Sequence, residues 1–374
     1  MIRINNYIVF NIAMLGFTFC FVSCIITDDS LCGTDYDRVL IVYFGGDNNL
    51  SGETLDKVEA LKKGLTPDYA RCKLLVYRDP SDNAPSLTEI TNRNGKTVAE
   101  TVAVYEEENS ASAVVFARVV SEIKKKYHGK TYSLLLFSHG SGWLPQGALT
   151  NPRLQRSIVM DGRNEMEIAD FARAIPDKTF DCIVFEACLM ACVEVAYELR
   201  AKTDYILASS AEIVSPGFTE IYPVALGDLL NVNLTAFADK AFNYFDSQSG
   251  IMKSATFSII KTAALQPLAD FVAENCHLDA TVDARLVQSF DRNASYRLFF
   301  DFEDYYSRLL DSDSQRQELQ RLINDCVIWK KATASFLDIN IARHSGLTSY
   351  IVQQNFPALN AFYENMEWRK AVKM

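Results

Sequence analysis

Short apolar runs alternate along the chain with segments of helical periodicity. The apolar runs cover residues 38–44, 73–77, 132–137, 181–187 and 204–210. Segments with helical spacing cover residues 51–63, 112–126 and 189–200. Strands that are apolar throughout and alternate with helices are typical of a parallel sheet covered on both faces. The pattern therefore predicts an α/β fold.

Two further regions have a different pattern. Residues 80–97 contain the turn residues Asn83 and Pro85 and the stretch NRNG, which predicts a hairpin or a loop. From about residue 250, residues 254–260 predict one more strand, helical patterns then dominate, and residues 346–352 predict a strand among them. No flexible linker separates the two parts. We therefore expect a core of residues 36–250 and a helix-rich C-terminal subdomain of residues 251–374 packed on it.

The first 24 residues read as an export signal. Arg3 precedes an apolar, uncharged stretch over residues 7–22, which ends in FVSC. This stretch is short for a spanning helix, and it is similar to a bacterial lipoprotein signal in which Cys24 carries the lipid. Ordinary cleavage near Ser23 and a retained anchor stay open as alternatives. The resemblance implies export and a lipid anchor in the bacterial cell envelope, with the outer membrane or the cell surface as one destination.

Charge and cysteine content exclude two classes of site. The net charge is −10, which argues against nucleic-acid binding because phosphate contacts need a basic face. The basic run Lys124–Lys126 is explained by the solvated end of a helix. The nine cysteines form no CxxC pair, so neither a zinc site nor a full disulfide framework is indicated. Beyond Cys20 and Cys24 an odd number remains, which leaves room for one reactive thiol.

Two of the predicted strands end in side chains suited to nucleophilic catalysis. His139 and Gly140 end one, and Glu186, Ala187 and Cys188 end another. Ligands of open parallel sheets bind at the carboxyl ends of the strands, so these residues should meet. A helix beginning directly after Cys188 would favour its thiolate, and His139 could take the proton. Gly140 would leave room for substrate, and the N–H groups of Gly140 and Cys188 could form an oxyanion hole.

The stretches FSHGSGW (137–143) and FEACLM (185–190) resemble the His-Gly and acid-Ala-Cys signatures of the clostripain-like cysteine peptidases, which are grouped with caspases, legumains and gingipains. VLIVYFGGDNNL and GLTSYIV are similar to further parts of that family, so the resemblance spans most of residues 38–374. It implies a caspase-like three-layer α/β/α sandwich with a mainly parallel central sheet. It also implies a catalytic dyad of His139 as general base and Cys188 as nucleophile, with no third residue required.

The resemblance also implies a substrate class. Members of the family cut polypeptides after Arg or Lys, and they usually carry Asp two residues before the nucleophile, where this chain has Glu186. Glu186 is either the acidic floor of the substrate pocket or a strand-end residue paired for structure. Ser209, Ser210 and Glu212 are candidates for the other pocket wall. Asp161 in VMDG is expected to order a turn and has no catalytic assignment.

Family members are made as zymogens, and the polar residues 144–157 between the two motifs offer Arg153 and Arg156 for self-cleavage. An ordinary surface loop is the alternative. No cofactor is required by the motifs. Some family members use calcium, and the acidic residues 106–108 and 301–304 could bind it weakly, although solvated charge also explains them. We expect a monomer.

Two other functions compete with that of a peptidase. A surface lipoprotein that keeps the fold but only binds peptides or host proteins is the alternative to a peptidase. A lipase or esterase of the α/β-hydrolase type is disfavoured because the chain has no G-x-S-x-G elbow.

Overall fold

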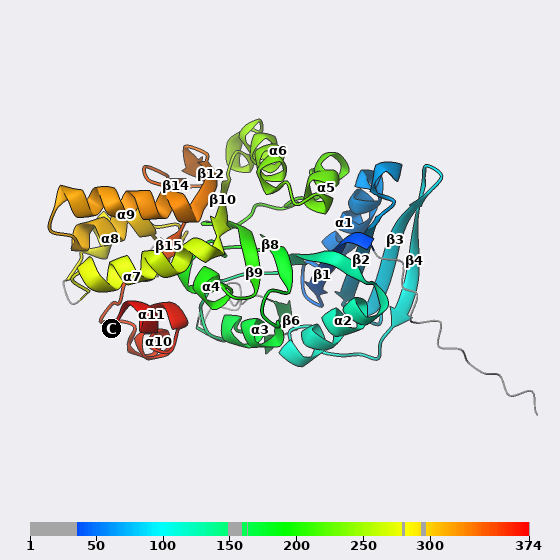
Figure 1. The fold of residues 1–374 in the computed structure, drawn as a ribbon, viewed down its shortest axis with the longest axis horizontal. Coiled ribbons are helices and arrows are strands. Elements are labelled where there is room, and N and C mark those ends of the chain that lie inside the picture. The colour runs from blue at the N-terminus through cyan, green and yellow to red at the C-terminus, as the bar shows by residue number, and fades with distance from the viewer. Residues whose placement is uncertain (1–35, 149–158, 163, 279–280, 293–296, 374) are drawn as a thin grey trace, which may run out of the picture. The chain divides into compact units, whose positions relative to one another are not determined.

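The computed structural model describes residues 36–148, 159–162, 164–278, 281–292 and 297–373. Its central feature is a nine-stranded sheet in the order β12-β10-β9-β8-β5-β1-β2-β3-β4 (Figure 1). The strands of this sheet are β1 Tyr36–Gly46, β2 Cys72–Pro80, β3 Ser86–Arg93, β4 Lys96–Val104, β5 Gly129–Phe137, β8 Phe180–Glu186, β9 Thr203–Ser209, β10 Thr256–Lys261 and β12 Val327–Ala332. The predicted α/β fold is confirmed.

The centre of the sheet is parallel and both of its sides are antiparallel. Strands β9, β8, β5, β1 and β2 run parallel to one another. Strands β3 and β4 extend one side, and β10 and β12 extend the other, all as antiparallel pairs. Because the five central strands are parallel, their carboxyl ends share one edge, where ligands bind in such sheets.

The helices form the outer two layers. They are α1 Ser51–Gly64, α2 Ala113–Lys126, α3 Ile168–Ala174, α4 Val193–Glu198, α5 Tyr222–Leu230, α6 Leu234–Asp246, α7 Leu265–Asn275, α8 Phe302–Tyr306, α9 Asp313–Cys326, α10 Pro357–Tyr363 and α11 Glu367–Val372. Helices α1, α5 and α6 lie on one side of the sheet, and α2, α3 and α4 lie on the other (Figure 1). The predicted helices over 51–63 and 112–126 are confirmed.

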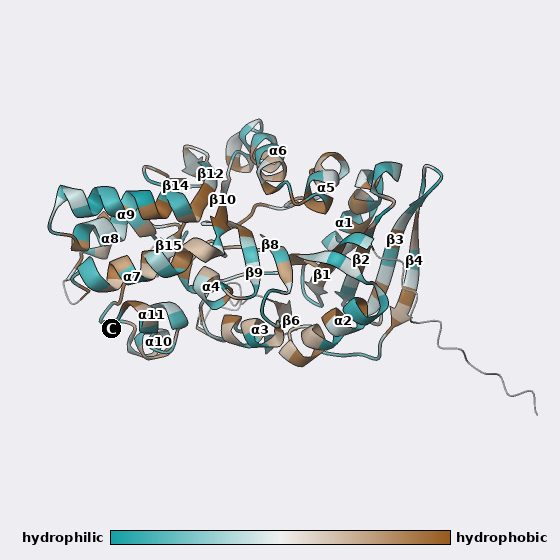
Figure 2. Ribbon diagram, viewed as in Figure 1, coloured by the Kyte–Doolittle hydropathy of each residue, from teal (hydrophilic) through white to brown (hydrophobic). Residues whose placement is uncertain are grey.

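Each face of the sheet has its own core, because side chains along a strand point alternately to opposite faces. In β1, Ile41 packs with Phe116 of α2 in one cluster, while Val42 packs with Leu61 of α1 in the other. The same alternation continues through β5 and β8, whose inner residues are almost wholly buried. Figure 2 shows brown, hydrophobic segments on the central strands and more teal on the outer helices. Burial on both faces explains the uninterrupted apolar runs.

The structure refines two sequence expectations and adds a strand that the sequence did not predict. Residues 80–97 contain the start of a hairpin, with Asn94 and Gly95 at positive φ in its turn, but β4 extends to Val104. The predicted strand over 346–352 is reduced to β15 (Thr348–Ser349), which pairs with β11 (Phe300–Asp301). Strand β12 was missed, since Lys330 and Lys331 give it the polar character of a sheet edge.

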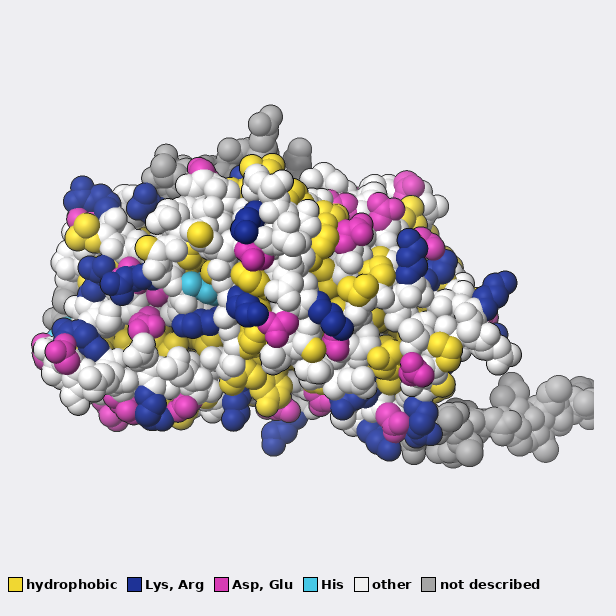
Figure 3. Space-filling model, turned by 90° about the horizontal axis from the view of Figure 1, so that it is seen from above, with side chains coloured by type: hydrophobic (Ala, Val, Ile, Leu, Met, Phe, Trp, Pro, Cys, Tyr) yellow, Lys and Arg dark blue, Asp and Glu magenta, His cyan; other side chains and the backbone are white. Residues whose placement is uncertain are grey.

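The remaining strands are short. They are β6 Met160–Asp161 with β7 Asn164–Glu165, and β13 Ser335–Phe336 with β14 Ile339–Asn340. None of the helices in the described part of the chain is long and apolar enough to cross a membrane. Seen from above in Figure 3, the surface carries basic and acidic side chains interspersed with one another.

Candidate active site

The register of two central strands brings the predicted pair together. Strand β5 pairs in parallel with β8, and Phe137 lies opposite Glu186 at their ends. His139 and Cys188 each follow two residues later, so they leave the sheet at the same level. Both side chains line one cavity of about 450 Å³, which we call the His139–Cys188 cavity. Each is largely buried, with 8% of His139 and 9% of Cys188 exposed.

The glycines after His139 let two loops touch. A Cβ atom at Gly140 would lie 2.5 Å from the carbonyl oxygen and 2.9 Å from the nitrogen of Cys188. Gly142 has φ +61°, and a Cβ there would lie 2.8 Å from the Leu189 carbonyl oxygen. Gly140 was expected to make room for substrate. The structure corrects this expectation, because the space beside Gly140 holds the backbone of Cys188.

The surroundings of Cys188 also differ from the expectation. Helix α4 begins at Val193, so Cys188 lies in a loop and the predicted effect of a helix N-terminus does not apply. Leu189 adopts φ +63°, which turns the chain sharply, and its N–H donates to the Ala211 carbonyl at 2.9 Å. The N–H of Ile213 lies 3.5 Å from the Cys188 sulphur. A donor to sulphur favours the thiolate, as a helix dipole would have done.

The other described cysteines are protected by burial. Burial raises the pKa of Cys182, Cys276 and Cys326 to about 12, and it raises the pKa of Cys192 well above the ordinary range. Burial also raises the pKa of the half-buried Cys72. These thiols stay protonated near neutral pH and react slowly. A thiol reagent that enters the His139–Cys188 cavity should therefore select Cys188.

His139 has a polar neighbour that sequence reasoning missed. The ring atom Nε2 lies 2.7 Å from Oδ1 of Asn49. Asn49 is exposed, lines the same cavity, and lies in the turn between β1 and α1. The signal was present in the sequence, because polar residues that follow the carboxyl end of β1 fall at the same edge as those that follow β5.

Glu186 lines the cavity, but its carboxylate is already neutralised. Lys57 of α1 places Nζ 2.6 Å from Glu186 Oε1, and both side chains are almost completely buried. Phe218 N–H also donates to Oε1, and the Tyr222 hydroxyl donates to Oε2. Burial and the nearby carboxylate raise the pKa of Tyr222, so its hydroxyl keeps the proton it donates. Of the two roles open to Glu186, the structure shows the paired, structural one.

The other predicted pocket residues separate into two groups. Glu212 lines the cavity and forms an ion pair with Arg292 at 2.6 Å. Ser209 and Ser210 have no exposed surface, so the expectation that they contact substrate is wrong. The Ser209 hydroxyl forms a hydrogen bond with the Thr256 hydroxyl at 2.9 Å, and the Ser210 hydroxyl forms one with His344 Nε2 at 3.2 Å. Both serines therefore stabilise the structure behind the cavity wall.

Glu53 is a cavity-lining carboxylate that the sequence did not single out. It lies in the first turn of α1 and accepts a hydrogen bond from the Ser215 hydroxyl at 2.9 Å. A neutral donor leaves the negative charge of Glu53 in place. Glu186 and Glu212, in contrast, each face a basic side chain.

Several predicted residues lie outside the described residues or take structural roles. Arg153, Arg156 and the lipid-bearing Cys24 lie outside the described residues. Asp161 accepts from the Ser110 N–H at 2.6 Å, as expected of a residue that orders a turn.

Three of the six acidic residues considered for calcium are engaged by the protein. Asp301 caps α8 and accepts from Ser345 N–H at 2.6 Å, Asp304 pairs with Arg308 at 2.9 Å, and Glu108 pairs with Arg118. Among the described residues, no group of three or more His, Cys, Asp or Glu side chains is placed to hold a metal ion. Asp301, Asp304 and Glu108 are therefore already engaged by other groups of the protein.

Known proteins share both the sequence pattern and the fold. The sequence model of the clostripain family, peptidase C11, matches residues 42–372. Clostripain from Hathewaya histolytica is 27% identical over 216 residues, which cover 48% of this chain and only 40% of clostripain.

Two solved structures cover nearly the whole described fold. An inactive zymogen of a C11 protease from Parabacteroides distasonis is 31% identical with a TM-score of 0.81, covering 91% of this chain and 99% of that one. A secreted C11 cysteine protease from Bacteroides thetaiotaomicron, bound to an irreversible peptide inhibitor, is 24% identical with a TM-score of 0.78, covering 90% and 99%. The resemblance noted in the sequence is thus confirmed, and the chain belongs to the clostripain family of peptidases.

Proposed function

We propose that the chain is a cysteine endopeptidase in which Cys188 is the nucleophile and His139 the general acid and base. Cys188 transfers its thiol proton to His139, and the sulphur attacks the scissile carbonyl carbon. The carbonyl electrons move onto oxygen, where the N–H groups of Gly140 and Cys188 would stabilise the charge. The C–N bond then breaks, and the departing amine takes a proton from His139. Water, deprotonated by His139, splits the thioester and releases the thiolate.

One observation carries this proposal. A parallel strand pair delivers an imidazole and a thiol to the same cavity, with the N–H of Ile213 directed at the sulphur. A general base and a nucleophile within one site are the minimum set for acyl transfer.

An affinity label tests the proposal directly. An arginyl acyloxymethyl ketone should modify Cys188 alone, because burial keeps the other described thiols protonated. Cys276→Ser should label like the wild type, and Cys188→Ala should not label. A wild-type chain that binds the peptide part without covalent labelling would instead support the silent, peptide-binding alternative.

For the substrate class we propose Arg or Lys at the cleaved position, with Glu53 as the carboxylate that receives the cation. The support is that Glu53 lines the cavity and forms no ion pair with a basic side chain of the described residues, whereas Glu186 is neutralised by Lys57. Glu53→Gln should lower kcat/KM about tenfold for peptides with Arg or Lys at the cleaved position, which corresponds to a loss of about 1.4 kcal/mol in binding free energy. The kcat/KM for peptides with a neutral residue at that position should change little. A uniform loss across all peptides would exclude this role.

We also propose activation by self-cleavage after Arg153 or Arg156. The support is the polar sequence of residues 144–157 and the family membership, in which a 31% identical relative is described as an inactive zymogen. Purified wild type should become two chains, while Cys188→Ala stays intact. Two chains from Cys188→Ala without added protease would exclude self-cleavage. Single Arg153→Gln and Arg156→Gln variants would identify the site.

Export and lipidation at Cys24 complete the proposal. They rest on the signal-like pattern of the first 24 residues. Expression in a bacterium with labelled palmitate should yield a labelled membrane fraction, and Cys24→Ser should remove the label. An unlabelled wild-type chain in the membrane fraction would favour a retained anchor.

A further inference from the structure

We propose that Asn49 is the positioning residue that orients His139 and fixes its tautomer, an inference that rests on the proposed function of His139 and Cys188. The expected dyad needs no third residue. The structure nevertheless brings the side chain of Asn49 to 2.7 Å from His139 Nε2, within the cavity that Cys188 also lines.

The contact determines which ring nitrogen exchanges the proton. Asn49 Oδ1 is an acceptor, so Nε2 carries hydrogen in the neutral ring. The lone pair of the neutral imidazole is then on Nδ1, and we assign proton exchange with the Cys188 sulphur to that atom. If Asn49 presented its amide NH₂ instead, the opposite tautomer would be favoured.

The turn that carries Asn49 is itself held firmly. Asn48 donates from Nδ2 to the Met160 carbonyl at 2.7 Å and to the Gly45 carbonyl at 3.2 Å, while its Oδ1 accepts from Leu50 N–H at 2.8 Å. An asparagine side chain that bonds to the backbone on both sides closes a local turn. The turn therefore fixes the direction of the next residue, Asn49.

The backbones of the same two residues, Gly45 and Met160, also hold the residue before His139. The Ser138 hydroxyl donates to the Gly45 carbonyl at 3.0 Å and accepts from Met160 N–H at 3.1 Å. Asn48 and Ser138 thus both bond to Gly45 and Met160. The residues before Asn49 and before His139 are thus held at the same place. This shared support keeps Asn49 Oδ1 at 2.7 Å from His139 Nε2.

Gly45 is required for this frame. A Cβ atom at Gly45 would lie 2.3 Å from Cγ1 of Val159 and 3.5 Å from the Ser138 hydroxyl. These contacts explain the Gly-Gly-Asp-Asn-Asn stretch of the sequence. Gly45 leaves room for the Val159 side chain, Asn48 closes the turn, and Asn49 contacts the imidazole of His139.

A neutral amide has a defined advantage over a carboxylate in this position. It accepts the Nε2 proton in both charge states of the ring, so it orients His139 without adding a negative charge that would raise the imidazole pKa. An aspartate in its place would orient the ring equally well but would shift the titration. This difference separates positioning from mere packing.

The first test is Asn49→Ala. Because Asn49 is exposed, the melting temperature should stay close to that of the wild type. The kcat/KM should fall about 10- to 100-fold, with the loss in kcat, as expected when a group that orients a catalytic histidine is removed. Asn365→Ala, an exposed asparagine that does not line the cavity, is the matched control. Wild-type kcat/KM in Asn49→Ala would overturn the inference.

The second test is Asn49→Asp, which keeps an acceptor and adds a charge. It should recover most of the rate lost in Asn49→Ala, and the limb of the pH profile that reports His139 should move up by about one pH unit or more. An unshifted profile would overturn the inference.

Alkylation of Cys188 by iodoacetamide separates this inference from the proposed function. Its pH dependence needs no substrate, and it should shift in Asn49→Asp as the rate profile does. If no peptide is hydrolysed but this shift is seen, the proposed function fails and the positioning role stands. If hydrolysis is normal and the shift is absent, the opposite holds.

Discussion

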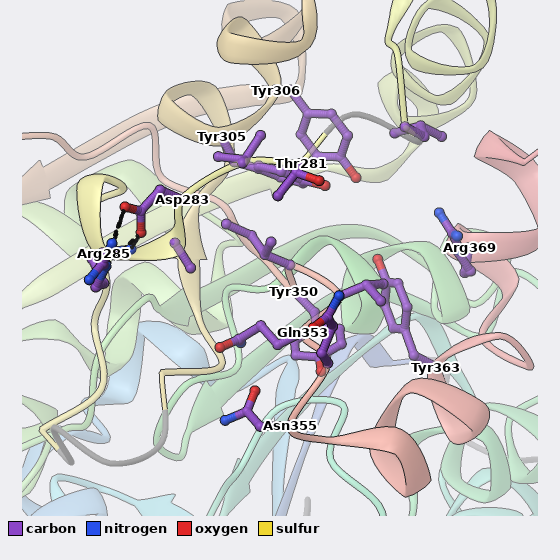
Figure 4. Close-up of a pocket in the computed structure, with 16 residues that line it drawn as sticks. Thr281, Asp283, Arg285, Tyr305, Tyr306, Tyr350, Gln353, Asn355, Tyr363 and Arg369 are labelled. Atoms are coloured by element: carbon purple, nitrogen blue, oxygen red, sulfur yellow. Dashed lines mark hydrogen bonds and ion pairs between the residues drawn. The ribbon is translucent and has the colours of Figure 1, made fainter.

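Two cavities of this protein differ in the chemistry that their polar side chains can carry out. The His139–Cys188 cavity has a volume of about 450 Å³, and a larger one of about 730 Å³ lies among the C-terminal elements. We call the larger one the tyrosine-rich cavity, because the rings of Tyr305, Tyr306, Tyr350 and Tyr363 surround it (Figure 4).

The charged side chains that line the tyrosine-rich cavity form ion pairs within the protein. Asp283 pairs with Arg285 at 2.7 Å, and Arg369 pairs with Glu364 at 3.2 Å. Burial raises the pKa of Tyr305 and Tyr350 to about 12, so both stay neutral. Among the described residues that line it there is neither a cysteine nor a histidine.

The smaller cavity combines a thiol, an imidazole and an amide at the carboxyl edge of parallel strands. Volume alone would favour the larger cavity as the site of chemistry, whereas our proposal places it in the smaller one. What distinguishes a reactive site is a set of convergent groups whose protons can move, and here the topology of the sheet supplies it.

The largest expected effect is the loss of peptide hydrolysis when Cys188 or His139 of the smaller cavity is replaced. Cys188→Ala should lower peptide hydrolysis by about 10⁴-fold or more, because no other described thiol lines that cavity. His139→Ala should lose about 10²- to 10⁴-fold, the range for a general acid and base. Steady-state rates on an Arg or Lys peptide measure both. Activity retained in Cys188→Ala would place the chemistry elsewhere and remove the contrast between the cavities.

The sequence could predict this contrast only in part. His139 and Cys188 follow strands whose apolar character is unmistakable, so their meeting at one edge follows from parallel pairing. Lys57 could not be foreseen, because a lysine in an exposed-looking helical pattern is normally solvated. Its partner Glu186 is 129 residues away in the sequence, and only the packing of α1 on the sheet brings the two together. Long-range pairing of this kind leaves no local pattern.

The ion pair of Lys57 and Glu186 at the floor of the smaller cavity resembles the ion pairs of the larger cavity. Lys57→Met leaves Glu186 buried without its cation, which should cost about 3–5 kcal/mol of unfolding free energy. The double variant Lys57→Met with Glu186→Gln should recover part of that loss, since the uncompensated charge is gone. Urea denaturation of the wild type, the two single variants and the double variant measures these free energies of unfolding. Additive losses in the double variant would show that the two side chains do not act as a pair.

A buried acid next to the larger cavity gives a pH-dependent prediction. Glu194 of α4 accepts from the Ser349 hydroxyl and the Tyr350 N–H, and its Oε2 has no hydrogen-bond partner among the described residues. Burial raises its pKa to about 7. The folded state therefore holds this proton more tightly than the unfolded chain, so stability is greatest below the unfolded pKa and falls as the pH rises towards 7.

Replacement by the neutral isostere should remove that pH dependence. Glu194→Gln keeps an acceptor for both donors and should raise the free energy of unfolding at pH 8 by on the order of 3 kcal/mol, with a much smaller gain at pH 5. Urea denaturation at the two pH values checks this. An equal effect at both would mean that ionisation of Glu194 is not its cause.

The smallest effect is expected inside the tyrosine-rich cavity itself. The Tyr350 hydroxyl donates to Asn360 Oδ1 at 2.7 Å, and Asn360 in turn donates to the Gln353 carbonyl at 2.7 Å. Tyr350→Phe removes one hydrogen bond and should cost about 1 kcal/mol of stability. The kcat/KM should stay within about twofold, because the ring still fills its place and no reacting group is touched. Tyr105→Phe, whose hydroxyl bonds to Glu122 outside both cavities, is the control. A tenfold loss of activity in Tyr350→Phe alone would show that the larger cavity acts on the smaller one, and the contrast between a structural and a reactive cavity would have to be abandoned.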